Sequence, residues 1–332
     1  MRTKHLVLIL VFLVSGCGEN QEIGCFVSDD AIVVGGQTGQ ELSPVQVFRK
    51  NNGTEPGTLD PHRAEGVPAS NVLRDLFEGL VMEDPSGAYI PGAAESWNIS
   101  EDAKTYTFKI RENSKWSNGD VLTAEDFVYG LRRSVDPATL SNYASMLYPI
   151  KNARDVVLGK KKPQALGVST DGPTTLIIEL EEPTPYFLSL LTHSTTYAAH
   201  RPTVEELGSQ FTRPGNLVSN GAFKLAEWRV QSHIKLVRNT EYWDDTNTTL
   251  DEVYYYPIDD VSSSLKRYRA QELDFTETVL AEQLPWIQQC LPNDLKISPY
   301  FGSYYYGFNN TQPPFKNKPK LRTALSMAID RT

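Results

Sequence analysis

The stretch TYTFKI at residues 105–110, followed by TAEDFVYGL at residues 123–131, decides the fold class of this chain. The first stretch alternates polar and apolar residues with a period of two, which predicts a half-buried β-strand. In the second stretch Thr123 is a suitable N-cap, and Asp126 stands at the capping-box position that Glu or Gln usually holds. A helix beginning there has an apolar face of Phe127, Val128 and Leu131. A strand followed by an amphipathic helix indicates mixed α and β structure.

Further strands are predicted on both sides of this unit. Apolar or alternating runs occur at residues 45–48, 176–180, 234–237 and 253–256. Pro183 and Pro185 end the run at 176–180, because proline cannot donate to a sheet. No internal repeat is visible, and 332 residues are enough for more than one lobe. We therefore expect an α/β or α+β body with more than one lobe.

The N-terminus predicts the compartment. Arg2 and Lys4 precede an apolar run at residues 6–14, and the small residues that follow lead into Cys17. This layout predicts a secretory signal peptide at residues 1–16. Its end resembles the lipoprotein box of bacteria, which implies acylation of Cys17, a lipid anchor and a place in the periplasm. Gly18 after the cysteine favours the outer membrane. The alternative is an ordinary signal peptide with a chance cysteine.

Residues 17–43 are rich in Gly, Gln and acidic residues, so we expect a flexible tether between the membrane and the folded body. The formal net charge is -9, and it becomes -11 without residues 1–16, since those carry two basic and no acidic residues. Such an acidic chain excludes nucleic acid as a partner. The five histidines show no zinc-ligand spacing, so no metal or cofactor is expected.

Motifs for catalysis are missing from the sequence. Adjacent acidic pairs such as Glu125-Asp126 and Asp259-Asp260 recur, but none is distinguished from solvated surface charge. There is no Gly-X-Ser-X-Gly elbow, Ser-X-X-Lys motif or P-loop. We therefore expect a binding protein without catalytic residues. A hydrolase of envelope peptides or glycans is kept as an alternative.

Tyrosine is the most abundant aromatic residue and forms two triplets, at residues 254–256 and 304–306. Tyrosine suits the binding of varied small ligands, because it is a rigid apolar plate with one polar tip. In a strand only the first and third tyrosine of a triplet share a face. At least one tyrosine per triplet is therefore expected to pack, and the second triplet is the better candidate for ligand contact.

Several short segments together resemble one family. They follow one another in order from about residue 47 to the end of the chain: NNGTE at 51–55, TLDPH at 58–62, EGVP at 65–68, RDLFEGL at 74–80, PGAAESW at 91–97, KWSNG at 115–119, FVY at 127–129, NGAFKL at 220–225, PPF at 313–315 and AID at 328–330. They are similar to segments of the oligopeptide-binding proteins, the extracytoplasmic solute-binding components of peptide ABC transporters.

The resemblance implies an α/β periplasmic-binding-protein-like fold of type II. Residues 44–300 would form the first lobe, with an inserted subdomain at about 78–200. Residues 301–332 would form the strand that crosses to the second lobe and the start of that lobe. In the family a short peptide is enclosed between the lobes and passed to a membrane permease, and main-chain pairing with roomy pockets gives broad specificity.

The resemblance also implies a set of peptide-binding residues. Glu65 and Val67 lie on the early loop that meets the ligand, Arg74 takes the place of a pocket-lining arginine, and Tyr143 that of a tyrosine near the peptide. Four more would lie on the crossing strand: Tyr300, Gly302, Tyr305 and Gly307. The alternative role for Arg74 is a surface salt bridge with Glu78, four residues further along a helix.

Two positions depart from the family. Typical members carry a cysteine, disulfide-bonded to the second lobe, at the position of Gly302. They carry an acidic residue at the position of Gly307. Without that acid, a preference for basic groups of the peptide is not implied here.

The end of the chain predicts truncation. A helical apolar stripe starts after Pro319, and Thr332 follows without a stop signal. Most of the second lobe would lie beyond it, with the aspartate that binds the peptide's α-ammonium in the family. We therefore expect this chain alone to have lost tight peptide capture. Two alternatives remain: a truncated, lipid-anchored module that binds another protein, and a gene fragment whose coding region continues.

Overall fold

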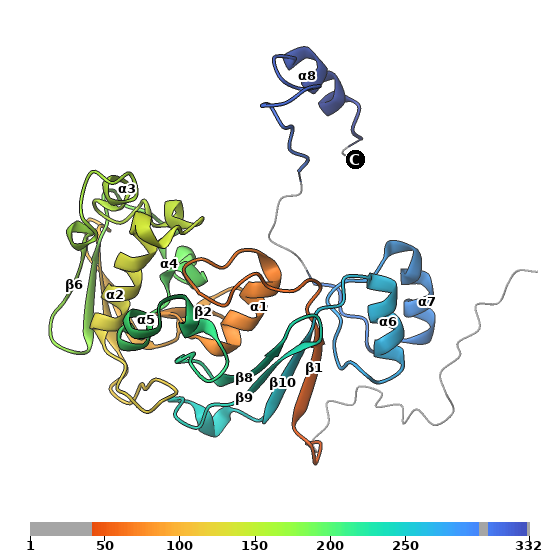
Figure 1. The fold of residues 1–332 in the computed structure, drawn as a ribbon, viewed down its shortest axis with the longest axis horizontal. Helices are drawn as coiled ribbons and strands as arrows, with labels where there is room; N and C mark the ends of the chain where they lie inside the picture. Colours follow the sequence, from red (N-terminus) through yellow and green to blue (C-terminus); the bar gives the residue numbers. More distant parts are fainter. Residues whose placement is uncertain (1–41, 299–304, 331–332) are drawn as a thin grey trace, which may run out of the picture.

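The computed structural model describes residues 42–298 and 305–330 of the chain (Figure 1). Two four-stranded sheets and one hairpin organise the body. The first sheet has the strand order β1-β10-β9-β8, with β1 Val47–Asn51, β8 Phe223–Arg229, β9 His233–Arg238 and β10 Glu252–Tyr256. The second sheet has the order β4-β5-β7-β6, with β4 Ala94–Ile99, β5 Thr105–Ile110, β6 Val168–Thr170 and β7 Thr175–Glu179. The hairpin pairs β2 Val81–Glu83 with β3 Tyr89–Pro91.

The helices surround these sheets (Figure 1). Their bounds are α1 Gly66–Leu76, α2 Ala124–Val135, α3 Ala153–Val157, α4 Phe187–Leu190, α5 Arg201–Leu207, α6 Val261–Arg269, α7 Leu284–Cys290 and α8 Pro319–Met327. In the described residues no helix is both long and apolar enough to cross a membrane.

In the first sheet, β1 runs parallel to β10 and the other neighbours are antiparallel. Strand alternation turns Tyr255 toward α1, where its hydroxyl donates to Asp75 Oδ2 at 2.6 Å. Tyr254 and Tyr256 share the opposite face and stack at 6.2 Å between ring centroids. The predicted division of this triplet between packing and an outer face is therefore confirmed.

The second sheet confirms the predicted strand and helix at residues 105–131. Strand β5 buries every second residue, and its buried members are Tyr106, Phe108 and Ile110. Helix α2 begins after Thr123, whose backbone N–H and hydroxyl both donate to Asp126 Oδ2, at 2.8 and 2.9 Å. Aspartate thus fills the capping-box position in place of the longer Glu or Gln.

The strands of the second sheet come between β1 and β8 in sequence, and the chain returns to the first sheet at a tight joint. Asn220 Nδ2 donates to the carbonyl of Glu78 at 2.9 Å, and Asn220 Oδ1 accepts from the N–H of Glu78 at 3.3 Å. Gly221 N–H donates to the carbonyl of Leu76 at 2.8 Å. The division into lobes with a subdomain at about 78–200 remains a prediction.

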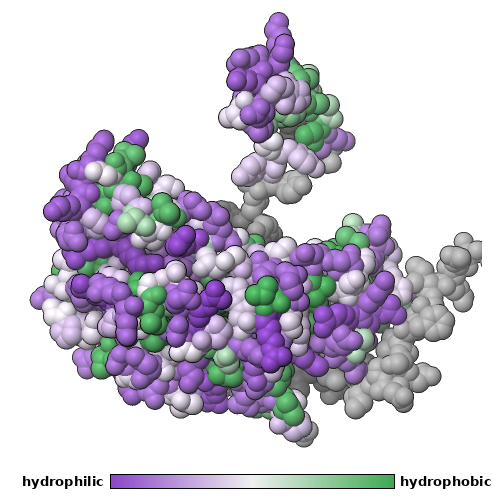
Figure 2. Space-filling model, in the orientation of Figure 1, coloured by the Kyte–Doolittle hydropathy of each residue, from purple (hydrophilic) through white to green (hydrophobic). Residues whose placement is uncertain are grey.

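Residues 305–330 form a separate segment beyond the body (Figure 1). Helix α8 confirms the predicted helix after Pro319, and its Leu321 and Leu325 are exposed. Figure 2 shows apolar residues gathered on one side of this segment. Residues 305–309 have no regular secondary structure, so the described part of the predicted crossing strand is not a strand. The physical reason is that no described strand lies beside it to accept its hydrogen bonds.

The strand predicted at residues 45–48 is partly wrong, because β1 begins only at Val47. Val45 is exposed, whereas β1 pairs along its length with β10. The predicted signal peptide, the lipidation site Cys17, nearly all of the tether, Tyr300 and Gly302 lie outside the described residues.

Candidate functional site

Helix α1 presents Val67 and Arg74 on one exposed stripe. The two residues are seven positions apart, which places them on the same helix face about 10 Å apart along the axis. Val67 is 54% exposed. Arg74 is also exposed, and its guanidinium makes no hydrogen bond or ion pair with any described residue. A charged side chain with free donors is available to a ligand here.

Glu65 is the N-cap of α1, and its exposed carboxylate makes no capping hydrogen bond. The alternative role for Arg74, a salt bridge with Glu78, is not observed. Helix α1 ends at Leu76, and Glu78 is buried beyond it. The Glu78 carboxylate accepts from Tyr242 Oη at 2.5 Å and from Trp243 Nε1 at 2.8 Å.

Tyr143 and His193 lie together although they are far apart in sequence. Their rings meet edge to face, with 4.9 Å between centroids. His193 precedes the short helical turn at Ser194–Thr196, which packs against α1. Burial lowers the pKa of His193, and the nearby positive charge of Arg74 lowers it further. His193 thus lies against Tyr143 and within the electrostatic influence of Arg74; we call these three residues the donor cluster.

The hydrogen bonds of His193 define its tautomer. Its Nδ1 faces the backbone N–H of Thr195 at 3.2 Å, and an N–H can only donate, so Nδ1 is the acceptor. Nε2 of this neutral ring therefore carries the hydrogen, and it has no partner among the described residues. The hydroxyl of Tyr143 is likewise without a described partner. The free donors of these three side chains suit a ligand rich in carbonyl or carboxylate oxygens.

His193 was missed by reasoning from the sequence. It is a lone histidine outside any motif, and only the packing of its turn against α1 places it beside Arg74. The predicted crossing-strand residues are the opposite case: the sequence named them, but the structure does not bring the described ones to the donor cluster. Tyr305 is 80% exposed, Gly307 lies in open space, and neither contacts the donor cluster in the described structure. Their peptide-binding role, like that of Tyr300 and Gly302, remains a prediction.

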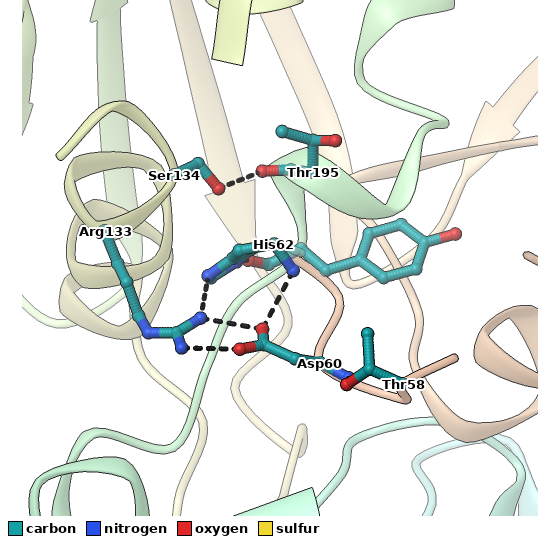
Figure 3. A network of polar contacts seen from close by, with 7 residues as sticks. Thr58, Asp60, His62, Arg133, Ser134 and Thr195 are labelled. Atoms are coloured by element: carbon teal, nitrogen blue, oxygen red, sulfur yellow. Dashed lines mark hydrogen bonds and ion pairs between the residues drawn. The ribbon is translucent and has the colours of Figure 1, made fainter. Parts of the chain in front are cut away.

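A second polar group lies inside the body (Figure 3). Arg133 of α2 donates to both carboxylate oxygens of Asp60, from Nη1 to Oδ1 at 2.8 Å and from Nη2 to Oδ2 at 2.6 Å. Its Nη1 also donates to His62 Nδ1 at 2.8 Å, and His62 Nε2 donates to the carbonyl of Tyr197 at 3.0 Å. Arginine cannot accept a hydrogen bond, so His62 is neutral with its hydrogen on Nε2.

The pKa shifts of His62 and Asp60 agree with these hydrogen bonds. Burial lowers the pKa of the fully buried His62 to about 4, and the neighbouring Arg133 charge acts in the same direction. Burial alone would raise the pKa of Asp60, but the hydrogen bonds from Arg133 hold it below its ordinary value. The group therefore fixes the 58–62 loop against α2, and this loop leads directly into Glu65.

Comparison with known proteins identifies the class. The model of the bacterial extracellular solute-binding proteins, family 5 Middle, matches residues 88–332, and the chain belongs to this family. The predicted fold class, an α/β periplasmic-binding-protein-like fold of type II, is thereby confirmed.

Particular relatives are similar over most of this chain. The periplasmic oligopeptide-binding protein OppA of Salmonella typhimurium is 44% identical over 296 residues, which are 88% of this chain and 54% of that protein. The probable deoxycholate-binding periplasmic protein YgiS of Escherichia coli is 42% identical, over 87% of this chain and 54% of its own length. The chain thus spans about half the length of these relatives.

Solved structures agree with these matches. The crystal structure of Haemophilus influenzae OppA in complex with RPPGFSPFR has a TM-score of 0.85 and 42% identity. It is matched over 88% of this chain and 57% of that chain. The murein tripeptide binding protein MppA of Escherichia coli has a TM-score of 0.84 and 39% identity, over 87% and 57%.

Proposed function

We propose that this protein is an extracytoplasmic solute-binding protein that binds short peptides and delivers them to the permease of an ABC transporter. The donor cluster of Arg74, Tyr143 and His193 is the observation that carries this proposal. Peptides offer a carbonyl at every residue and a carboxylate at one end, and these are the groups that three unpartnered donors bind. Relatives named as oligopeptide-binding and murein tripeptide binding proteins support the peptide as ligand.

The shape of α1 supports a short, extended ligand. The stripe from Val67 to Arg74 is about 10 Å long, the length of about three extended residues. The exposed Val67 side chain offers apolar contact at one end, and the Arg74 guanidinium offers charge at the other. A peptide lying along this stripe would reach both, while His193 and Tyr143 contact the Arg74 end.

The proposal includes a lipid anchor at Cys17, with the outer membrane favoured. The apolar run at residues 6–14, the small residues before Cys17 and Gly18 after it support this placement. OppA of Salmonella typhimurium is named as periplasmic, which supports the extracytoplasmic side. The proposal includes no catalytic step, in keeping with relatives that are named as binding proteins.

Titration of the chain with the tripeptide Ala-Phe-Ala, followed by NMR, tests this proposal. NMR detects weak as well as tight binding, so it reports on the peptide site whatever the affinity. Arg74→Gln should weaken binding by about tenfold, since one charge-assisted hydrogen bond contributes about 1.5 kcal/mol. Arg154→Gln, which alters another exposed arginine, should leave it unchanged.

The outcomes separate the alternatives. An Arg74→Gln variant that binds Ala-Phe-Ala as well as the parent would exclude the donor cluster as the peptide site. Binding of deoxycholate without binding of the tripeptide would show that the ligand class is wrong. Micromolar or tighter binding would contradict the expected loss of tight capture. Mass spectrometry should recover the tripeptide intact, and cleavage would favour the hydrolase alternative.

A further inference from the structure

A cavity of about 430 Å³ lies beside the Asp60–Arg133 ion pair. The loop at residues 57–63 forms one wall, and the segment from Val204 of α5 to Thr212 forms another. None of its lining residues belongs to the donor cluster or to the stripe of α1. The cavity is therefore a separate place on the body, and the proposed peptide site leaves it unused.

The charge on the cavity wall is positive. Arg133 has five N–H donors, and Asp60 with His62 uses three of them, so two remain. Arg63 lines the same cavity and is exposed, and its guanidinium makes no hydrogen bond or ion pair with a described residue. Both oxygens of Asp60, the one acid of the lining, already accept from Arg133. Two arginines against one carboxylate leave one positive charge without a counter-charge.

The remaining walls suit a ligand that is partly apolar. The ring of Phe211 lies 5.4 Å from the guanidinium carbon of Arg133, and Val204 adds an aliphatic side chain. Thr58 Oγ1 accepts from the backbone N–H of Asp60 at 3.1 Å, which leaves its hydroxyl hydrogen free to donate. The cavity thus combines a cationic end, a hydroxyl donor and an aromatic wall.

A neighbouring cavity of about 320 Å³ provides an internal comparison. It shares Arg133, but its other arginines, Arg132 and Arg201, face three carboxylates: Glu125, Asp136 and Glu205. Its lining has no excess of positive charge, and Arg201 already pairs with Glu205 at 2.7 Å. Only the larger of these two cavities therefore carries uncompensated positive charge.

We propose that the 430 Å³ cavity is a second ligand site, which binds a small organic carboxylate that carries an apolar group. The carboxylate pairs with Arg63 and with the free donors of Arg133, and the apolar group lies against Phe211. A ligand in this position links the 57–63 loop to the 208–212 segment. Because the loop continues into Glu65, occupancy of this site stabilises the start of α1.

The test uses N-acetyl-phenylalanine and its amide as probes on the whole chain. The two differ in the carboxylate alone, and neither has the α-ammonium of a free peptide. We expect the acid to bind at least about tenfold more tightly than the amide. Arg63→Gln should lower the affinity for the acid by about tenfold, because one charge-assisted pair is lost. Arg154→Gln serves as the matched control and should have no effect.

The test must also show that N-acetyl-phenylalanine does not bind at the proposed peptide site. Arg74→Gln should leave binding of N-acetyl-phenylalanine unchanged, and the NMR shifts should fall on residues 208–212. Loss of binding in Arg74→Gln would instead place this ligand on the donor cluster and overturn the proposal. Equal affinity for acid and amide, an unaffected Arg63→Gln variant, or no binding to the parent chain would each overturn it as well. Failure of tripeptide binding alone would leave this site standing.

Discussion

At Arg133 a buried charge and its partners depend on one another. The side chain is 15% exposed and that of Asp60 is 6% exposed, so both ions have lost most of their water. Their attraction and the bond to His62 compensate for this loss. Removing one partner of a buried pair leaves the other charge uncompensated, which costs far more than losing a surface pair.

We therefore expect Arg133→Leu to lower the free energy of unfolding by about 3–5 kcal/mol. Urea denaturation followed by circular dichroism measures this change. Arg154→Leu, which removes an exposed arginine without a described partner, should stay within about 0.5 kcal/mol of the parent. Equal stability of the two variants would mean that the Asp60 charge does not depend on Arg133.

Residue-level roles were only partly predictable from the sequence. Arg74 could be named because it stands in a recognisable segment. Glu78 could not be placed, because a helical pattern suggests contact with Arg74 four positions earlier. The chain leaves the helix at Phe77, which has extended dihedral angles of -127° and 150°. The extended backbone at Phe77 places the Glu78 carboxylate beside Tyr242 and Trp243.

Among the elements, the end of α1 closely approaches the backbone just before β8. A Cβ on Gly221 would lie 2.6 Å from the carbonyl carbon of Leu76 and 2.7 Å from the carbonyl oxygen of Asp75. Both atoms belong to the rigid end of a helix. The approach is therefore possible only without a side chain at this position.

We expect Gly221→Ala to destabilise the fold by about 1–3 kcal/mol, because overpacking forces backbone shifts. The midpoint and slope of urea unfolding measure the effect. Gly57→Ala is the control, since a Cβ there meets no atom within 4 Å and its φ is not positive. If the two variants were equally stable, α1 would be free to move away from β8 at little cost.

The elements themselves were largely predictable. Alternation at residues 105–110 and 234–237, and the capping pair Thr123 and Asp126, are local patterns that match β5, β9 and the start of α2. The pairing of parallel β1 with β10 was not predictable, because it joins residues about 200 positions apart and leaves no local pattern. The beginning of β1 was misplaced for the same reason.

For the molecule as a whole, Glu78 and His62 make the free energy of unfolding depend on pH in opposite directions. Burial raises the pKa of Glu78 from 4.5 to about 7. Its folded form holds a proton that the unfolded form releases, so its contribution is complete below pH 4.5 and is lost as the pH rises through 7. His62 has its pKa lowered from 6.5 to about 4, so its contribution is complete above pH 6.5 and is lost as the pH falls toward 4.

These opposite slopes largely cancel between pH 4.5 and 6.5. Glu78→Gln replaces the carboxyl with an uncharged amide of similar shape that does not titrate. We expect it to gain stability relative to the parent as the pH rises from 4.5 to 7, by up to about 3 kcal/mol. Urea unfolding of both proteins across this range measures the difference. A difference that does not change with pH would show that Glu78 titrates normally.

The candidate site was less predictable than the fold. The residues of α1 belong to one short segment, but the donor cluster joins three distant parts of the chain, and its geometry exists only after folding. The same is true of Arg63, because its proposed role in ligand binding depends on the cavity that α5 and the 208–212 segment form beside it.

The joint between Glu78 and Asn220 has a consequence for how this molecule can change. The chain leaves the first sheet at Glu78 and returns at Asn220, and the two residues are hydrogen-bonded to each other. The segment between them therefore begins and ends at one place, and it also contacts the rest of the body where Arg133 pairs with Asp60. A cassette with neighbouring ends can be exchanged for a longer, shorter or unrelated one without stretching its host. A graft at this joint that keeps the contacts of Arg133 with Asp60 and His62 would therefore replace the second sheet while β1, β8, β9 and β10 keep their places.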